Sequence, residues 1–341
     1  MHYLVTGHTG FKGSWLSLML QMQGHEVSGI SLDPDKKSLF TQAKLASIFK
    51  KDLRANICNR EHILKLIAKL NPDVIIHLAA QPLVRESYKY PIKTFETNVL
   101  GTLNILEATK NVSNLKATLI VTTDKVYKNH SQLIGYKETD ELGGMDPYSA
   151  SKAAADIATN SWAKSFAESP VAIARAGNVI GGGDWAIDRI IPDLVNAYSK
   201  NQVPTIRYPN AVRPWQHVFD CLSGYIALVD SQIHDGTEGA WNFGPMESSA
   251  RTVRELALAF AKNWGWSDVA YKFEQDMAPS EANLLLLDSS KARNLLGWKD
   301  SLTFEESIEM TVDWYKVWER SSPSEFTRMQ MENYLQKLKL D

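Results

Sequence analysis

Two short stretches of the sequence bring together side chains that can transfer protons. The first is VTTDKVY, in which Thr123, Asp124 and Lys125 follow one another. The second is YSASK, in which Tyr148 and Lys152 are four residues apart. On a helix, positions i and i+4 lie on the same face, so the last two side chains would lie side by side.

The pair formed by Tyr148 and Lys152 suits acid–base chemistry on a hydroxyl group. A tyrosine has a pKa of about 10, and a neighbouring ammonium lowers that pKa because it favours the phenolate. Such a tyrosine can take a proton from a hydroxyl while a hydride leaves the same carbon, and Thr123 would hydrogen-bond that hydroxyl. Taken alone, the pair is also compatible with an ordinary surface helix. It becomes specific together with the loop described next.

A glycine-rich loop, VTGHTGFKG, carries Gly7, Gly10 and Gly13 between a predicted strand and a predicted helix. Glycine permits the tight turn and lets a pyrophosphate approach the backbone. The N–H groups and the dipole at the helix N-terminus then favour an anion. The spacing is G-x-x-G-x-x-G, and its place between strand and helix predicts a dinucleotide site rather than an ordinary loop.

Asp33 follows the second predicted strand and is a candidate ribose ligand. A carboxylate there accepts the hydroxyl groups of an adenosine ribose and repels a 2′-phosphate, which favours NAD over NADP. A solvated loop acid in the run DPDKK is the competing interpretation. The segment HLAAQ ends another predicted strand, where the small Ala79 and Ala80 either leave room for a cofactor or pack in the core.

The elements that must position these residues alternate between strands and helices. Short apolar runs predict the strands, and apolar residues at helical spacing predict the helices. The predicted strands are 3–7, 26–32, 72–80, 117–124 and 171–179, and the predicted helices are 13–24, 59–71, 92–111 and 146–169. Such alternation is typical of a Rossmann-type doubly wound parallel sheet, an α/β fold with helices on both faces.

The amino-acid composition and the order of predicted elements change after Asn178. Glycine, proline and tryptophan become common, strand-like pieces mix with helices, and the helical tail has a break at Ser321–Pro323. These features predict a smaller α/β C-terminal substrate lobe that shares chain with the first unit. The expected domains are residues 1–177 plus about 211–244 for the dinucleotide, and about 178–210 plus 245–341 for the substrate.

Composition excludes several partners. The 341 residues carry a formal net charge of −2 at pH 7, so no global field attracts nucleic acid or an anionic membrane, and we expect neither as a partner. The two cysteines, Cys58 and Cys221, have neither zinc-site nor disulfide spacing, and we expect no metal. No apolar run reaches transmembrane length and no signal peptide is recognisable, so we expect a cytoplasmic protein.

Several longer blocks carry a resemblance to a known family. The stretches VTGHTGFKGSWL, HLAAQPLVRESY, TNVLGTLNILEA, TTDKVYKN, GGMDPYSASKAAAD, ARAGNVIGGGDWAIDRIIPD and RPWQHV resemble the CDP-glucose 4,6-dehydratases of bacterial surface-polysaccharide pathways. The tail EFTRMQMENY also looks like that of these enzymes. They belong to the extended short-chain dehydrogenase/reductase superfamily, which the sequence resembles over essentially its whole length.

The resemblance implies an internal redox elimination on CDP-D-glucose with NAD as cofactor. The C4 hydride passes to NAD+ while Tyr148 takes the proton of the 4-hydroxyl. The resulting 4-ketone acidifies the C5 hydrogen, water is lost across C5 and C6, and the hydride returns to C6. The product is CDP-4-keto-6-deoxy-D-glucose, which the resemblance connects with deoxysugar, O-antigen and lipopolysaccharide biosynthesis.

The resemblance also assigns Asp124 as the acid that protonates the leaving C6 oxygen. Related dTDP-glucose 4,6-dehydratases carry an Asp–Glu pair at this strand end, whereas this chain has Asp124 followed by Lys125. A lysine is normally protonated at neutral pH, so Lys125 removes the C5 proton only if its surroundings depress its pKa. Alternatively, Lys125 stays charged and stabilises the enolate, and another group is the base.

The motifs and the resemblance together give the expected ligand contacts. For NAD they are Gly7, Thr9, Gly10, Phe11, Gly13, Asp33, Asn56, Ile57, Leu78, Ala79, Ala80, Asn98, Tyr148 and Lys152. For the nucleotide sugar they are Arg85, Asn178, Arg189, Arg207 and Arg213. An arginine suits a diphosphate because of its planar donor fork. Relatives have an acid where this chain has Asn56, whose amide can still bond to adenine.

Other functions and the assembly stay open at this stage. A 4-epimerase, a decarboxylase or a 4,6-dehydratase of another nucleotide sugar would also need NAD and Tyr148, although the TTDK block favours water loss. A non-catalytic NAD-binding sensor or scaffold would be expected to lack Tyr148 or Lys152, and both are present. Small residues on the helices at 92–110 and 148–168 correspond, by resemblance, to a dimer bundle, so we expect a homodimer or homotetramer.

Overall fold

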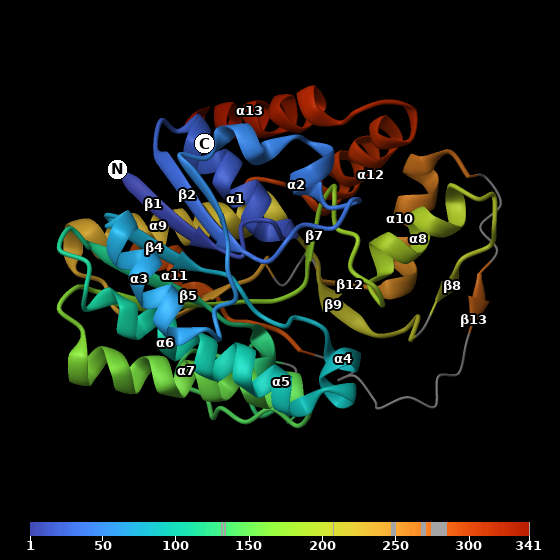
Figure 1. The fold of residues 1–341 in the computed structure, drawn as a ribbon. Coiled ribbons are helices and arrows are strands. Elements are labelled where there is room, and N and C mark those ends of the chain that lie inside the picture. Colours follow the sequence, from blue (N-terminus) through green and yellow to red (C-terminus); the bar gives the residue numbers. More distant parts are fainter. Residues whose placement is uncertain are drawn as a thin grey trace.

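A seven-stranded parallel sheet forms the centre of the molecule (Figure 1). In this computed structural model, which describes residues 1–130, 132, 134–206, 208–246, 250–266, 271–273 and 285–340, the strand order is β11-β6-β5-β4-β1-β2-β3. These strands are β1 (His2–Thr6), β2 (Glu26–Ser31), β3 (Lys51–Arg54), β4 (Val74–His77), β5 (Ala117–Val121), β6 (Val171–Ala176) and β11 (Gly239–Phe243). Every neighbouring pair is parallel. The predicted doubly wound α/β fold is confirmed.

Helices cover both faces of the sheet (Figure 1). On one face lie α1 (Phe11–Met22) and α9 (Val218–Asp235), with α13 (Ser324–Leu340) packed against α1. On the other face lie α3 (Arg60–Leu70), α6 (Gly101–Thr109) and α7 (Pro147–Phe166). Because both faces are covered, β4, β5 and β6 are buried along their whole length, as expected of parallel strands.

Successive side chains of one strand serve the two faces in turn. Tyr3 and Val5 of β1 belong to the core under α1 and α9, whereas Leu4 packs with Ile63 and Ile67 of α3. This alternation explains why β1 reads as a continuous apolar run.

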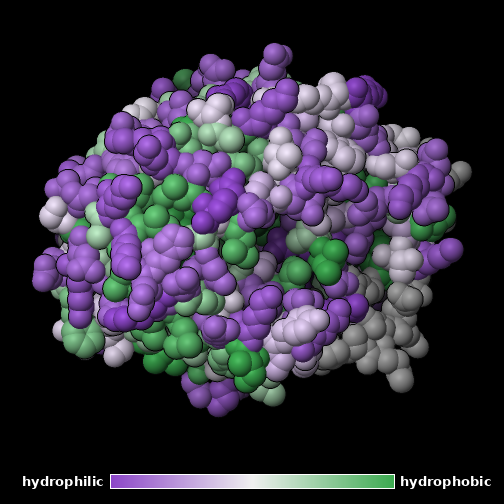
Figure 2. Space-filling view, viewed as in Figure 1, coloured by the Kyte–Doolittle hydropathy of each residue, from purple (hydrophilic) through white to green (hydrophobic). Residues whose placement is uncertain are grey.

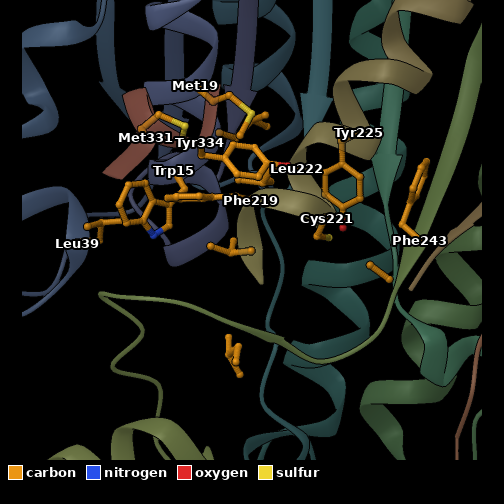
Figure 3. Packing of buried hydrophobic residues seen from close by; sticks show 14 of the residues in the cluster. Trp15, Met19, Leu39, Phe219, Cys221, Leu222, Tyr225, Phe243, Met331 and Tyr334 are labelled. Atoms are coloured by element: carbon orange, nitrogen blue, oxygen red, sulfur yellow. The ribbon is translucent and has the colours of Figure 1, made fainter. Parts of the chain in front are cut away.

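The core under α1 also holds the C-terminal helix (Figure 3). Trp15 of α1 lies edge-on to Phe219 of α9, with 4.7 Å between ring centroids, and Phe219 is 5.1 Å from Tyr334 of α13. Met331 joins the same cluster and is fully buried. The end of the chain therefore packs on the dinucleotide half, while the expected domain boundaries stay a prediction.

A smaller group of elements lies beside the carboxyl ends of the strands, to the right in Figure 1. It includes α8 (Ile190–Tyr198), α10 (Val253–Trp264) and the antiparallel pair of β9 (Val212–Pro214) with β12 (Ala250–Thr252). The remaining elements are α2 (Leu39–Gln42), α4 (Val84–Lys89), α5 (Pro91–Phe95), β7 (Val179–Ile180), β8 (Thr205–Ile206), β10 (Gln216–His217), β13 (Lys272–Phe273), α11 (Ser290–Leu296) and α12 (Phe304–Arg320).

Three features differ from the sequence-based expectation. The helix predicted at 92–111 consists of α5, a π-helical turn at Glu96–Leu100 and α6. Neither α9 nor β3 was among the predicted elements, although α9 is buried along most of its length. The break in the tail is confirmed, because α12 ends at Arg320 and α13 begins at Ser324. Within the described residues, no helix combines the length and apolar character that a membrane span requires.

Candidate active site

A large cleft lies where the parallel strands end, and its mouth is the hollow near the centre of Figure 2. Its volume of about 1510 Å³ exceeds the roughly 300–1,000 Å³ usual for one small ligand. The predicted residues that line it are Gly7, Thr9, Gly10, Phe11, Gly13, Asp33, Asn56, Ile57, Leu78, Ala79, Ala80, Arg85, Thr123, Asp124, Lys125, Tyr148, Lys152, Asn178, Arg189 and Arg213. The cleft therefore has room for two ligands side by side.

Two glycines of the glycine-rich loop cannot carry a side chain, because neighbouring backbone occupies the space. Gly7 has φ 75°, and a Cβ there would lie 2.8 Å from the backbone nitrogen of Ala79. A Cβ at Gly13 would lie 2.1 Å from the carbonyl oxygen of Gly7. The loop closes with a 3.0 Å hydrogen bond from Gly10 N to that same oxygen. The open N-terminus of α1 then faces the cleft, as an anion-binding terminus requires.

Beyond this loop, polar side chains line the end of the cleft expected to hold adenosine. Asp33 follows β2, and its side chain is 91% exposed. Thr9 and Ser31 are joined by a 2.7 Å hydrogen bond between hydroxyls. Asn56 accepts from the backbone of Cys58, which holds its amide at the start of the turn before α3. The hydrogen-bonding groups needed for a ribose and a base are therefore present.

Asn98 is the one described cofactor candidate that does not line the cleft. It is only 1% exposed and lies in the π-helical turn between α5 and α6. Its side chain accepts from Gln81 N at 2.8 Å and donates to the carbonyl oxygen of Gln81 at 3.1 Å and to Ser151 Oγ at 2.9 Å. In the ligand-free molecule Asn98 therefore supports the cleft wall from behind.

Two buried histidines near the cleft, His77 and His217, have structural hydrogen-bond partners. His77 at the end of β4 bonds to Thr6 at 2.7 Å and to Thr102 at 3.1 Å. Burial, with the charge of Lys152, lowers the pKa of His77 to about 3, so its ring is neutral. His217 accepts from the backbone N–H of Phe219, and burial lowers its pKa to about 3 as well. Among the described residues, no group of three or more potential metal ligands is found.

The catalytic pair is positioned by the start of α7. Asp146 caps the helix by accepting from Ser149 N at 2.9 Å, and Pro147 occupies the first helical position, where proline fits best. Tyr148 and Lys152 follow on one face of the helix, and both are more than nine-tenths buried. Lys152 Nζ donates to the carbonyl oxygen of Val121 at 3.0 Å. This bond ties the helix to the carboxyl end of β5.

The second group of reactive side chains lies in the turn that follows β5. Thr123 accepts from Lys125 N at 3.4 Å and so caps the short 3₁₀ turn Asp124–Val126. The hydroxyl of Thr123 donates to Asp124 Oδ1 at 2.9 Å. Lys125 lines the cleft next to these residues. The five predicted catalytic residues are therefore gathered in one place, although their roles stay predictions.

Burial dominates the electrostatics of this group. It raises the pKa of Tyr148 to about 12, although a hydrogen bond with Thr123 offsets part of the effect. It raises the pKa of Asp124, against the nearby charges of Lys125 and Arg213 and the Thr123 hydrogen bond. It lowers the pKa of Lys152 to about 8, and the charge of Lys12 adds to this effect. Without ligands, the cleft therefore favours neutral forms of its acids and bases.

The substrate arginines are held at the cleft by acidic partners. Arg189 pairs with Asp184 at 2.9 Å, and Arg85 on α4 pairs with Asp188 at 3.4 Å. Arg213 on β9 lies close enough to Asp124 to act on its pKa. Arg213 and Asn178 both line the cleft. The remaining candidate, Arg207, lies outside the described residues.

Comparison with known proteins identifies the family. The family model described as GDP-mannose 4,6 dehydratase matches residues 4–311. The CDP-glucose 4,6-dehydratase of Salmonella typhimurium is 43% identical over 328 residues, which cover 93% of this chain and 90% of that protein. The chain belongs to the GDP-mannose 4,6 dehydratase family. The resemblance noted in the sequence is thus confirmed at the level of the family.

Solved structures of related proteins agree with the fold and contain the expected cofactor. The dTDP-glucose 4,6-dehydratase of Bacillus anthracis in complex with NAD has a TM-score of 0.79 and 25% identity, covering 95% of this chain and 99% of its own. The UDP-glucose 4-epimerase of Thermus thermophilus, also in complex with NAD, has a TM-score of 0.78 and 25% identity, covering 93% and 99%. The fold therefore serves both dehydratases and epimerases, and the residues of the site must distinguish them.

Lys12 and Arg54 are charged residues in or beside the cleft that were not among the sequence candidates. Lys12 lines the cleft and donates to the hydroxyl of Tyr225 at 3.1 Å. Its place inside the glycine loop, in GFKG, is the signal that would have marked it. Arg54 at the end of β3 contacts Asp33 at 3.4 Å. No local motif marks Arg54 as part of the site, because Asp33, its partner at the cleft, is distant in sequence.

The buried ammonium of Lys152 should cost stability in the absence of ligands. Below about pH 8, Lys152 is protonated in both the folded and the unfolded chain, and the full cost is present. Between its folded pKa of about 8 and its ordinary value of 10.5, the unfolded chain binds a proton that the native chain does not, so stability rises with pH. We expect Lys152→Met to gain up to about 3 kcal/mol of stability at pH 7 from removal of this charge, less the cost of leaving the carbonyl oxygen of Val121 unpaired, with the electrostatic gain lost near pH 10.

Urea unfolding at pH 7 and pH 10 measures this difference. Lys164→Met on the same helix is the matched control, because Lys164 is exposed and its replacement should change the free energy of unfolding little at either pH. An equal gain for the two variants, or a gain for Lys152→Met that does not shrink with pH, would contradict the electrostatic origin of the cost.

Proposed function

We propose that the chain is an NAD-dependent CDP-glucose 4,6-dehydratase. The observation that carries this proposal is the clustering of Thr123, Asp124 and Lys125 with Tyr148 and Lys152 in one cleft beside the glycine loop. The 43% identity with the Salmonella enzyme over 93% of the chain supports the same substrate. A 4-epimerase would need the tyrosine and the lysine, but no acid at the position of Asp124 for the loss of water.

In this proposal Tyr148 is the proton acceptor at the 4-hydroxyl of the sugar. NAD, held at the glycine loop with Gly7, Gly10 and Gly13, would supply the hydride acceptor for C4 and the hydride donor for C6. With a pKa of about 12 in the ligand-free cleft, Tyr148 is protonated at neutral pH. Positive charge beside its ring favours the phenolate, and the ammonium of Lys152 one turn along α7 contributes such charge. Thr123 would hold the sugar hydroxyl in line with the phenolic oxygen.

Asp124 has the properties of a general acid. It is 5% exposed, and burial raises its pKa, so it holds its proton to higher pH than an ordinary aspartate. The proton would pass to the C6 oxygen as that oxygen leaves as water. The hydroxyl of Thr123, 2.9 Å from Asp124 Oδ1, orients the carboxyl group.

Lys125 is proposed as the base that removes the C5 proton. It follows the acid directly in the chain and lines the same cleft, which supports roles for both at one bound sugar. To accept a proton its amine must be neutral, which positive charge nearby favours. Lys152 and the bound oxidised nicotinamide are the expected sources. The alternative role for Lys125 is a charged one, in which it stabilises the enolate.

The diphosphate of the nucleotide sugar is assigned to Arg213, Arg189 and Arg85, with Asn178 nearby. Arg189 and Arg85 already hold carboxylates at 2.9 Å and 3.4 Å, so an incoming diphosphate would compete with Asp184 and Asp188 for them. A guanidinium binds a phosphate with the same two-pronged geometry that it uses for a carboxylate. Arg207 is kept in the proposed set on the basis of the resemblance alone.

A homodimer or homotetramer is proposed from the apolar surface of α5, the π-helical turn Glu96–Leu100 and α7. Ile92, Leu100, Ile157 and Phe166 are between 53% and 80% exposed, and hydrophobic side chains gather at the lower edge of Figure 2 over α5 and α7. An apolar patch of this kind marks an interaction surface. The cytoplasmic location and a place in deoxysugar, O-antigen and lipopolysaccharide biosynthesis stay predictions from the resemblance.

The proposed reaction predicts turnover of one nucleotide sugar. We expect the purified protein with NAD+ in D2O to convert CDP-glucose to a 4-keto-6-deoxy sugar with deuterium at C5, observed by NMR. Parallel samples with dTDP-glucose, UDP-glucose and GDP-mannose should change far less. If one of these three were converted instead, the proposed mechanism would stand but the assigned substrate would change. Inversion at C4 alone, or no reaction with any of the four, would contradict a dehydratase.

Replacing the proposed base and replacing the proposed acid should block different steps of the reaction. In Lys125→Met we expect oxidation at C4 to continue while exchange of the C5 hydrogen with D2O slows by at least about a hundredfold, the usual range for losing a general base. In Asp124→Asn we expect exchange at C5 to continue while water loss stops. Normal exchange at C5 in Lys125→Met would exclude this residue as the base.

The assembly should respond to a charge placed on the apolar surface. We expect wild type to sediment as a dimer or tetramer, and Ile157→Asp to shift toward monomer because a buried unpaired carboxylate opposes association. Leu295→Asp on α11 is the control, since Leu295 is 69% exposed and belongs to a different helix. A wild-type monomer at micromolar concentration would contradict the proposal.

A further inference from the structure

Four charged or ionisable side chains form a chain that ends at the ribose side of the cleft. Arg54 Nε lies 3.4 Å from Asp33 Oδ1. Both terminal nitrogens of Arg54 bond to Asp52, Nη2 at 3.1 Å from Oδ2 and Nη1 closely to Oδ1. Asp52 in turn bonds to His8 Nε2 at 2.7 Å. One guanidinium is thus shared between two carboxylates, of which Asp33 lines the cleft.

The sheet itself brings these residues together. β2 and β3 are parallel neighbours, with Ser31 opposite Arg54, so the last side chain of β3 lies beside the segment that follows β2. Asp33 stands in that segment. His8 comes from the glycine loop after β1 and is completely buried. The chain of contacts therefore links the glycine loop, β3 and the carboxylate that the ribose is expected to meet.

The net charge of this group is negative. Burial alone would raise the pKa of Asp52, but hydrogen bonds from Arg54 and His8 outweigh it and hold that pKa below its ordinary value, so Asp52 is ionised. Burial lowers the pKa of His8, which leaves its ring neutral at pH 7. Two carboxylates and one guanidinium sum to a formal charge of −1. A 2′-phosphate placed here would meet net repulsion, whereas a 2′-hydroxyl finds an acceptor in Asp33.

We infer that Asp52 and Arg54, acting with Asp33, determine which dinucleotide this chain accepts. Arg54 positions Asp33 toward the ribose, and Asp52 holds the donor fork of Arg54, which would otherwise be well suited to a phosphate. Removing Asp33 alone therefore leaves a neutral ion pair, not a phosphate site. Removing the charge of Asp52 as well releases the guanidinium. This inference rests on the proposed use of NAD.

Binding experiments with purified variants test the inference without relying on turnover. Calorimetric titration with NAD+, NADP+ and adenosine 2′,5′-bisphosphate would compare wild type, Asp33→Ala, Asp33→Ala/Asp52→Asn and the triple variant that adds Arg54→Met. Asparagine at 52 keeps an amide oxygen that can accept from His8. We expect NADP+ and the bisphosphate to bind about tenfold tighter in the double variant than in Asp33→Ala. The triple variant should lose that gain.

A matched control separates a specific contact from a change in overall charge. Asp35→Ala/Asp52→Asn removes the same number of charges, and Asp35 lies in the same loop but makes no contact with Arg54, capping Lys37 N at 2.8 Å instead. An equal gain in this control, or a gain that survives Arg54→Met, would overturn the inference. NAD+ binding in the double variant without any gain for NADP+ would refute the inference alone, whereas wild type that binds neither dinucleotide would refute the proposed function as well.

Discussion

The hydrogen bond from the Lys152 ammonium to the carbonyl oxygen of Val121 connects the two halves of the catalytic group. It joins the first turns of α7 to the end of β5, and so brings Tyr148 to the strand end that carries Asp124. The bond forms inside the protein, where a charged group is costly to bury. Burial accordingly lowers the pKa of Lys152 to about 8, and it raises the pKa values of Asp124 and Tyr148, so that these two acids hold their protons to higher pH than usual.

The parallel sheet explains why this group meets the glycine loop at all. Parallel strands present their carboxyl ends at one edge, so residues far apart in sequence converge there. The loop after β1, the segment after β2 and the turn after β5 reach the cleft in this way. α13, packed through Tyr334 on Phe219, adds to the support of α1 from the far side.

Sequence patterns predicted the parts of the fold that depend on local order. The alternating strands and helices and the pairing of Tyr148 with Lys152 follow from spacing that a single element imposes. α9 was not predicted, because it is buried on nearly all sides and so lacks a distinct polar face. β3 was not predicted because its KDLR sequence is half exposed and polar. The contact of Asp52 with His8 joins residues 44 positions apart, and no local pattern encodes such a pair.

The side chains near the two ends of the cleft differ in charge: carboxylates predominate near the expected ribose end, and cations predominate near the catalytic residues. Around the ribose end, Asp33 and Asp52 outnumber Arg54. Toward the catalytic end, Lys12, Lys125 and Arg213 surround one buried aspartate, which burial keeps protonated more readily than usual. A dinucleotide whose ribose carries no phosphate fits the acidic end, and a sugar diphosphate fits the basic end. The acidic end thus opposes a 2′-phosphate on the dinucleotide, whereas the basic end favours the diphosphate of a nucleotide sugar.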